Sequence, residues 1–286
     1  MSNHSSLPQS GTRPVASPAP RIAPSAASSL RPNPLRAFAV LYVAEVRRYL
    51  DETRVYISSY LSSMAVTAIV VAMFVFATDF GSDPSYWVGF LFWNAASTLV
   101  VESSVSISSD KQSGTFTQLM LRPASMLLQI TVKTLTWSVV NIAIDIVFLV
   151  ALFALIGAPV GFSWSVIPIA LVTFAGLYGL TMVMASLTVR YTKTASWCDL
   201  IGYAMMFLGG VVMPVDQLPR PLELLGRLLP ITQGIAMSRN AIAGRMLSAA
   251  DWLVLCGQSA AFVALGYVLF QLIMRSGRRH GINMRY

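Results

Sequence analysis

The chain has 286 residues, of which 55% are hydrophobic and only 11% are charged, and its mean hydropathy is +0.65. Soluble domains carry about 25% charged residues, so an ordinary soluble globule is excluded. Cys198 and Cys256 lie inside apolar runs, and His4 and His280 lie near the two ends of the chain. This distribution excludes a disulfide framework, a cysteine zinc site and a histidine-centred catalytic site in the body of the chain. In so apolar a chain, the net charge of +8 indicates anchoring at the inner face of a membrane rather than nucleic-acid binding.

The N-terminal part of the sequence falls into two segments. Residues 1–34 hold seven of the 15 prolines and no acidic residue, which predicts a disordered cytoplasmic tail. Residues 35–54 repeat apolar side chains at helical spacing, with charged residues on the remaining face. We expect an amphipathic helix that lies on the membrane surface, although a cytoplasmic extension of the following helix fits the same periodicity.

Six apolar runs follow, and they predict an all-α polytopic membrane domain over residues 55–275 with a basic cytoplasmic tail at 276–286. A span needs about 20 residues at a rise of 1.5 Å each, which the longer runs exceed. Gly157, Pro159 and Gly161 interrupt the apolar sequence between two of the spans. The six predicted spans are 55–78, 85–101, about 133–156, 164–189, 197–213 and 252–274.

Orientation follows from the Lys and Arg residues between the spans. The first and third connections carry none, whereas both terminal segments and the second and fourth connections carry several. The positive-inside rule therefore predicts that both termini are cytoplasmic. The fifth connection, 215–251, holds four arginines against this rule, and its prolines divide it into short amphipathic pieces. We interpret it as a folded, partly re-entrant external stretch, where the charge rule is weak.

Two motifs resemble a known family. The run from Glu102 to Pro123 resembles the E-x-x-x-G-T-x-x-x-L-x-x-x-P stretch of ABC-2 type transporter permeases, and the run from Gly209 to Gly244 is similar to their external G-V-x-x-P-x-x-x-L-P signature. The resemblance covers residues 35–275. It departs at the acid before the G-T pair, which here is Asp110 followed by Lys111. Drug, polyketide and lipo-oligosaccharide exporters of that family resemble the external motif most.

The resemblance implies a transport subunit of the bacterial cytoplasmic membrane that is not itself an enzyme. No G-x-x-x-x-G-K-[ST] phosphate loop occurs, so ATP and Mg would be bound by a separate P-loop ATPase subunit, present in two copies, and this chain would bind no cofactor or metal. A second copy of the chain and membrane lipids are the other implied partners, and no nucleic acid is. A short helix after Asp110 would contact the ATPase, since exposed apolar residues in a polar connection indicate a binding partner. The alternative is an ordinary solvated turn. The implied coupling residues are Glu102, Asp110, Lys111, Gly114, Thr115, Phe116, Leu119 and Met120.

The same resemblance implies a cargo path bordered by the second and fifth spans along a two-fold axis. Its cargo would be amphipathic, such as a drug, a lipid or a lipid-linked glycan, and core packing explains the same helix faces equally well. The cargo-path residues are Phe90, Trp93, Asn94 and Ser97 on the second span and Tyr203, Met206, Phe207 and Gly210 on the fifth. The external gate consists of Gly209, Pro214, Pro219 and Pro230.

One acidic residue lies deep inside a predicted span. Asp145 is 12 positions beyond Lys133, about 18 Å along the helix, so it should face protein or water. It is either a proton or substrate contact, or a neutral group hydrogen-bonded to a neighbouring span. The first reading leaves open a proton-coupled secondary transporter as the alternative function. An intramembrane enzyme lacks a cluster of His, Asp or Glu residues to support it.

Overall fold

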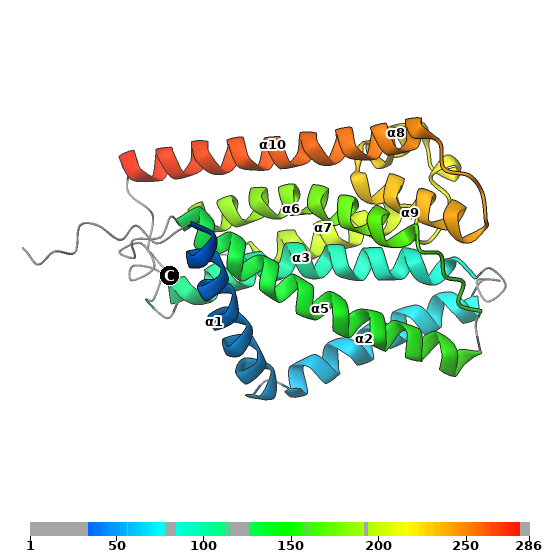
Figure 1. The fold of residues 1–286 in the computed structure, drawn as a ribbon, viewed down its shortest axis with the longest axis horizontal. Coiled ribbons are helices and arrows are strands. Elements are labelled where there is room, and N and C mark those ends of the chain that lie inside the picture. Colours follow the sequence, from blue (N-terminus) through cyan, green and yellow to red (C-terminus); the bar gives the residue numbers. More distant parts are fainter. Residues whose placement is uncertain are drawn as a thin grey trace, which may run out of the picture.

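The computed structural model describes residues 34–55, 57–77, 84–112, 114, 126–157, 159–191 and 194–280, and throughout these ranges the regular structure is helical (Figure 1). The predicted tail, apart from Pro34, and residues 281–286 lie outside them. The last helix continues to His280, so residues 276–280 are helical rather than part of a tail. The elements are α1 (Pro34–Val55), α2 (Ile57–Ala77), α3 (Tyr86–Gln112), α5 (Met126–Ile156), α6 (Val166–Arg190), α7 (Ala195–Leu208), η2 (Val215–Gln217), α8 (Arg220–Leu228), α9 (Pro230–Ile242) and α10 (Ala249–His280).

Among the described residues, four helices are long and apolar enough to cross a membrane, within residues 86–112, 131–156, 166–190 and 249–273. The first and fifth predicted spans correspond to shorter apolar stretches, Tyr60–Phe76 in α2 and Ser196–Leu208 in α7. Within the predicted fifth span the helix stops early, because α7 ends at Leu208 and Gly210 adopts a φ of 75°, which a continuing helix cannot contain. The chain is a polytopic membrane protein.

Helix α3 lies at the centre of the bundle. It packs against α5, α6, α7 and α9, and much of the hydrophobic core comes from its side chains (Figure 1). Residues 86–100 of α3 are buried or nearly so, and a segment with neighbours on most sides needs no polar face, which explains why apolar residues are distributed around its circumference there. Because α3 contacts so many neighbours, it sets the position of both ends of the bundle.

Helices α6 and α10 lie side by side along a contact built from small residues (Figure 1). A Cβ atom on Gly179 would collide with the carbonyl of Phe262, and one on Gly266 would collide with the carbonyl of Gly179. At Gly176 a Cβ would approach the Ser259 hydroxyl to 2.6 Å. The backbones therefore approach closely in the manner of membrane helices that associate through small residues.

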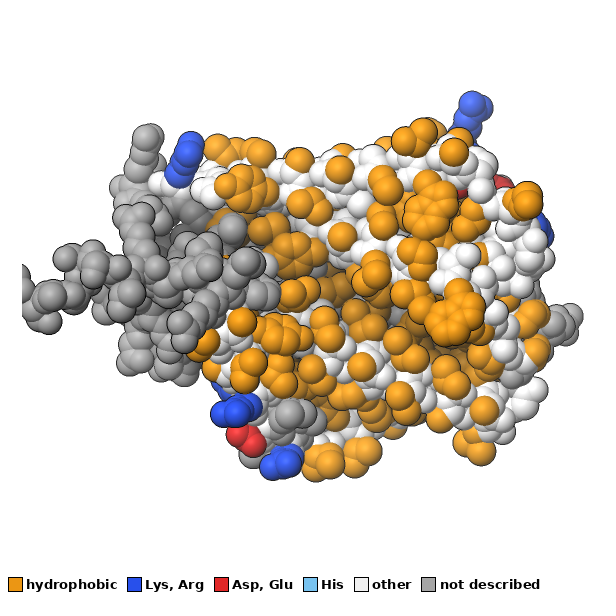
Figure 2. Space-filling model, in the orientation of Figure 1, with side chains coloured by type: hydrophobic (Ala, Val, Ile, Leu, Met, Phe, Trp, Pro, Cys, Tyr) orange, Lys and Arg blue, Asp and Glu red, His pale blue; other side chains and the backbone are white. Residues whose placement is uncertain are grey.

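Helix α1 occupies the range predicted to be helical and runs at an angle to the bundle (Figure 1). It contacts α5 and α2, and its Tyr49 is fully buried. Figure 2 shows that hydrophobic side chains cover the middle of the visible face, whereas charged side chains lie towards its two ends. This distribution is typical of a surface that meets the hydrocarbon core of a bilayer.

Candidate functional site

The predicted coupling segment begins at the C-terminal end of α3. There Lys133 Nζ on α5 donates to Asp110 Oδ2 at 2.8 Å, and only 11% and 13% of the two side chains are exposed. The neighbouring Lys111 is buried and donates to the carbonyl oxygens of Thr188 and Val189, at 2.9 and 2.6 Å. These carbonyls belong to the last turn of α6, where the helix offers no further backbone N–H groups to bond them. Asp110 and Lys111 therefore connect α3 to α5 and α6 inside this chain.

The remaining coupling residues are only partly described. Gly114 has a φ of 71°, and its N–H donates to the Lys111 carbonyl at 3.1 Å, which closes a turn directly after α3. Glu102 lies within α3. Thr115, Phe116, Leu119 and Met120, and with them the predicted short helix, lie outside the described residues.

The predicted cargo-path residues of α3 do not share one open face. Phe90 is fully buried, with its ring centroid 5.9 Å from that of Phe74 on α2 and 6.3 Å from that of Phe153 on α5. Trp93, on the side towards α7, donates its indole N–H to the Gly202 carbonyl at 3.0 Å. Helical spacing groups these residues, but the central position of α3 divides them: Phe90 faces α2 and α5, whereas Trp93 faces α7.

The predicted residues of α7 also divide between two faces. On the face towards α3, Gly202 lies opposite Ser97 of α3, where a Cβ on the glycine would approach the serine hydroxyl to 3.0 Å, and Met206 is buried. Tyr203 and Phe207, in contrast, are 55% and 49% exposed. Within one chain, α7 thus uses one face to pack on α3 and presents aromatic side chains on the other.

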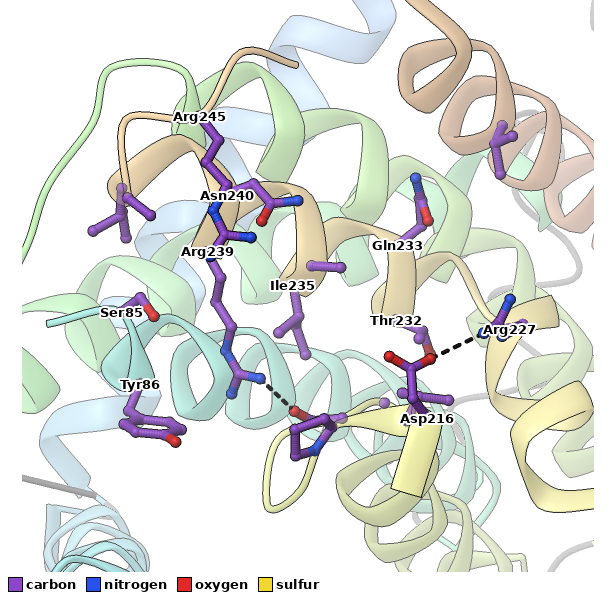
Figure 3. Close-up of a pocket in the computed structure, with 18 of the residues that line it drawn as sticks. Ser85, Tyr86, Asp216, Arg227, Thr232, Gln233, Ile235, Arg239, Asn240 and Arg245 are labelled. Atoms are coloured by element: carbon purple, nitrogen blue, oxygen red, sulfur yellow. Dashed lines mark hydrogen bonds and ion pairs between the residues drawn. The ribbon is translucent and has the colours of Figure 1, made fainter. Parts of the chain in front are cut away.

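The predicted gate is held by an arginine that the sequence did not single out. Arg239 on α9 donates from Nη1 to the Gly210 carbonyl at 2.8 Å (Figure 3). It also donates from Nη2 to the Val211 carbonyl at 3.2 Å. Its guanidinium also lies 5.3 Å from the ring centroid of Tyr86, at the start of α3. Arg239 therefore joins the turn after α7 to α9 and α3.

The gate prolines mark the junctions between the short helices that follow this turn. Pro214 precedes η2, Pro219 precedes α8, and Pro230 is the first residue of α9, where its missing N–H costs no helical hydrogen bond. Gly209 is buried. The predicted subdivision of the fifth connection is confirmed.

A pocket of about 720 Å³ lies between this turn, α9 and α10 (Figure 3). Arg227 on its rim pairs with Asp216 at 2.9 Å and with Glu223 at 2.7 Å, and its backbone carbonyl accepts a hydrogen bond from Gln258 Nε2 on α10 at 2.7 Å. Two of the arginines that oppose the positive-inside rule, Arg227 and Arg239, are thus engaged within the fold.

A second cavity, of about 410 Å³, opens between α2, α3 and α5, and we refer to it as the polar crevice. Asn94 on α3 and Asp145 on α5 both line it, and their side chains are hydrogen-bonded to each other. Asn94 therefore belongs to this crevice, away from the predicted partners Tyr203 and Phe207. Its lining comprises Tyr60, Ser63, Met64, Thr67, Asn94, Thr98, Val105, Ser109, Trp137, Asn141, Ile144, Asp145 and Phe148.

Helix α1 reaches the wall of this crevice. The Tyr49 hydroxyl donates to Asn141 Oδ1 at 2.9 Å, and the Tyr49 ring stands edge-on to Trp137, with centroids 4.9 Å apart. Sequence reasoning missed both residues, although Trp137, Asn141 and Asp145 recur every four positions and so share a face of α5. That spacing could have revealed the polar face, whereas nothing in the sequence pairs Tyr49 with Asn141.

Comparison with known proteins identifies the family. The profile of the ABC-2 type transporter family matches residues 36–243. Nodulation protein J of Sinorhizobium fredii (strain NBRC 101917 / NGR234) is 32% identical over 96 residues, which span 32% of this chain and 37% of the relative. The matched domain is a membrane permease domain without a nucleotide-binding site. With a match that extends from α1 to just past the end of α9, this chain belongs to the ABC-2 type transporter family.

Proposed function

We propose that the chain is the permease subunit of an ATP-driven exporter, which works as a homodimer with two copies of a separate ATPase and moves an amphipathic cargo out of the bacterial cytoplasm. The family match over residues 36–243 is the observation that carries this proposal. The same match favours an ATP-driven permease over the alternative of a proton-coupled secondary transporter. The external motif of residues 209–244 resembles that of lipo-oligosaccharide exporters, which favours export, and cargo of the lipid-linked glycan kind is the class that we favour.

The geometry at the end of α3 supports coupling through residues 110–123. Asp110 and Lys111 join α3 to α5 and α6, and the segment that follows Gly114 is attached directly to this junction. A displacement of that segment by the ATPase would move three helices together. We assign contact with the ATPase to Phe116, Leu119 and Met120, and anchoring of the helices to Asp110 and Lys111.

The exposed aromatics of α7 support a path between two copies of the chain. Tyr203 and Phe207 are about half exposed although α7 packs closely on α3. A two-fold axis beside α7 would present each of these rings twice and enclose a wide apolar path with few residue types. In this arrangement each copy crosses the membrane six times, through α2, α7 and the four long helices. Both termini of each copy then lie in the cytoplasm.

Co-purification tests the proposal. The full chain, affinity-tagged and expressed in its native host, should bring down a P-loop ATPase whose hydrolysis responds to the permease. Phe116→Asp should abolish that association because it places a charge on the apolar contact surface. Gln118→Asp is the matched control, since it adds the same charge to the same segment away from Phe116, Leu119 and Met120.

The thermal unfolding midpoint of both variants shows whether the permease itself is intact. A Phe116→Asp protein that unfolds like the wild type, retains the ATPase and transports at the wild-type rate would show that the coupling assignment is wrong. Absence of any P-loop ATPase from the purified complex would contradict the proposed function itself.

A further inference from the structure

Three of the four arginines in the fifth connection line one cavity, the pocket of about 720 Å³ between the turn after α7, α9 and α10, which we call the arginine pocket. They are Arg227, Arg239 and Arg245, and Asp216 is the one acid among the described residues of the lining. The volume lies within the range of about 300–1,000 Å³ typical of small-molecule sites. The charge that opposes the positive-inside rule is therefore gathered at a cavity large enough for a ligand.

The three arginines differ in what they contact. Arg227 forms ion pairs with Asp216 and Glu223, so its charge is balanced within the fold. Arg239 directs its fork at two backbone carbonyls and holds the turn after α7. Arg245 is exposed, and within the described part of the chain its side chain forms no hydrogen bond or ion pair. Arg245 is thus the guanidinium that a ligand can engage without breaking a contact of the fold.

The backbone holds Arg245 next to Asn240. Gly244 follows α9 with a φ of 72°, and its N–H donates to the Ala241 carbonyl at 3.2 Å. The Arg245 N–H donates to the Asn240 carbonyl at 2.9 Å. These two bonds form a Schellman motif, which the left-handed glycine completes. Because Arg245 and Asn240 both line the pocket, the motif brings a guanidinium and a carboxamide to the same wall.

The face of α9 towards the pocket carries a second carboxamide. Gln233 and Asn240 extend from α9 two turns apart (Figure 3). Neither carboxamide is hydrogen-bonded to another residue that the structure describes. Carboxamide N–H groups and the arginine fork all donate to acceptor oxygens, and the fork matches a phosphate with two parallel bonds. This set fits an anion with several acceptor oxygens, whereas the arginines would repel a cation.

A phosphate group can reach the pocket in two ways. Val254 of α10 lines the pocket and is 47% exposed, and its neighbour Leu253 is 74% exposed. These side chains offer an apolar surface for acyl chains, so a phospholipid can place its phosphate in the pocket. A free phosphate ion can reach the same donors from water, because Arg245 is exposed.

We propose that the arginine pocket binds a phosphate group, carried by an anionic phospholipid or free in solution, with Arg245 and Asn240 as its binding residues. The inference goes beyond the proposed function, because it assigns a ligand site to the external gate. Arg239 precedes Asn240 on α9, so a phosphate bound here acts on the helix that holds the turn after α7.

Binding to the full chain, purified in dodecyl maltoside and phosphate-free buffer, tests the proposal. The lipid probe is dioctanoyl phosphatidylglycerol, its phosphate-free counterpart is dioctanoylglycerol, and native mass spectrometry measures the apparent Kd of each. Inorganic phosphate is the free probe, titrated by calorimetry with sodium chloride of equal ionic strength as the reference. Arg245→Gln should weaken binding of the phosphate-bearing probe about tenfold, because it removes a charge-assisted hydrogen bond. Arg220→Gln is the matched control, since it removes the same charge from an exposed position outside the lining.

Two further variants separate binding from folding. Ala236→Phe fills the pocket without removing a donor and should abolish binding at an unchanged unfolding midpoint, since Ala236 is an exposed residue of the lining. Asp216→Asn removes the acid that competes with an anion and should tighten binding about threefold, a gain that damage to the fold does not produce.

The two probes identify the source of the phosphate. Binding of phosphatidylglycerol alone supports a lipid head group, and binding of inorganic phosphate supports a free ion. The proposal is overturned if neither probe binds, if dioctanoylglycerol binds as tightly as phosphatidylglycerol, or if Arg245→Gln binds like Arg220→Gln. The assay contains neither ATPase nor nucleotide, so its result is independent of the proposed function.

Discussion

Lys133 and Asp110 lie 23 positions apart in the sequence and form an ion pair of 2.8 Å between α5 and α3, with only about a tenth of each side chain exposed. A long lysine at a span boundary is expected to extend towards water. Here it turns inward instead, because the carboxylate at the end of α3 compensates the charge where solvent access is low. The pair therefore fixes the relative position of two spans next to the coupling segment.

Removing one partner of this pair should destabilise the permease. Asp110→Asn leaves the Lys133 ammonium buried without its counter-charge, and we expect a loss of about 3 kcal/mol in unfolding free energy. Lys133→Met in the Asp110→Asn background should recover part of it. Thermal unfolding of purified protein measures both changes.

Asp51→Asn is the control, because it breaks the Arg54–Asp51 pair, in which both side chains are about four-fifths exposed. That change should have no measurable effect on the unfolding midpoint. Equal midpoints for Asp110→Asn and the wild type would show that the buried pair does not hold α3 to α5.

The same substitution at two phenylalanines separates packing from transport. Phe90→Ala removes a fully buried ring between α2 and α5 and should cost about 3–5 kcal/mol in unfolding free energy. Phe207→Ala removes a half-exposed ring and should leave stability near the wild-type value while it alters transport and cargo-stimulated ATP hydrolysis.

Unfolding midpoints and hydrolysis by the reconstituted complex check the two variants in parallel. If Phe207→Ala lowers the midpoint as much as Phe90→Ala does and the surviving protein turns over normally, the α7 face is a packing surface and not part of a cargo path.

Arg239 should control the rigidity of the turn after α7. Arg239→Lys keeps the charge but loses the planar fork that reaches both the Gly210 and the Val211 carbonyls. We expect about tenfold faster amide exchange over residues 209–215, measured by hydrogen–deuterium exchange. Arg245→Lys, in the same pocket but exposed, is the control that should leave exchange unchanged. Identical exchange in both variants would remove Arg239 from the proposed gate.

Helix α7 gives the sharpest test of topology, because its 14 residues correspond to only about 21 Å. The hydrocarbon core is about 30 Å thick, so α7 can cross only with the turn that follows it. In a Cys198→Ser, Cys256→Ser background, Tyr191→Cys should react with a membrane-impermeant maleimide only from the cytoplasm and Met246→Cys only from outside. Labelling of both from the same side would exclude a crossing between them.

The long helices could be predicted closely from the sequence. The predicted span 164–189 corresponds to Val166–Arg190, because an uninterrupted apolar run follows the Gly157–Gly161 break and ends at a charge. Gly209, Gly210 and Pro214 predict an interruption near the end of the fifth span, but the sequence does not reveal that Gly210 adopts a positive φ or that α7 ends at Leu208. Stretches without charges define spans well, whereas their ends depend on backbone conformation.

The candidate site was harder to predict than the fold, for reasons that particular residues make plain. Helical spacing grouped Phe90 with Trp93, but α3 is surrounded, so Phe90 packs against α2 and α5 whereas Trp93 is hydrogen-bonded to α7. Lys111 is a charged residue in a polar segment, which is typical of a solvated loop, yet it donates to two carbonyls of α6. Such contacts depend on which helix lies on which side of α3, and a single sequence does not reveal that arrangement.

The burial of Tyr49 connects α1 to the interior of the bundle. Its hydroxyl donates to Asn141 and its ring packs on Trp137, so a helix expected only to anchor the chain reaches halfway along α5. Any tilt of α1 therefore has to move or break these two contacts, and the orientation of the first helix and the side-chain arrangement on α5 change together.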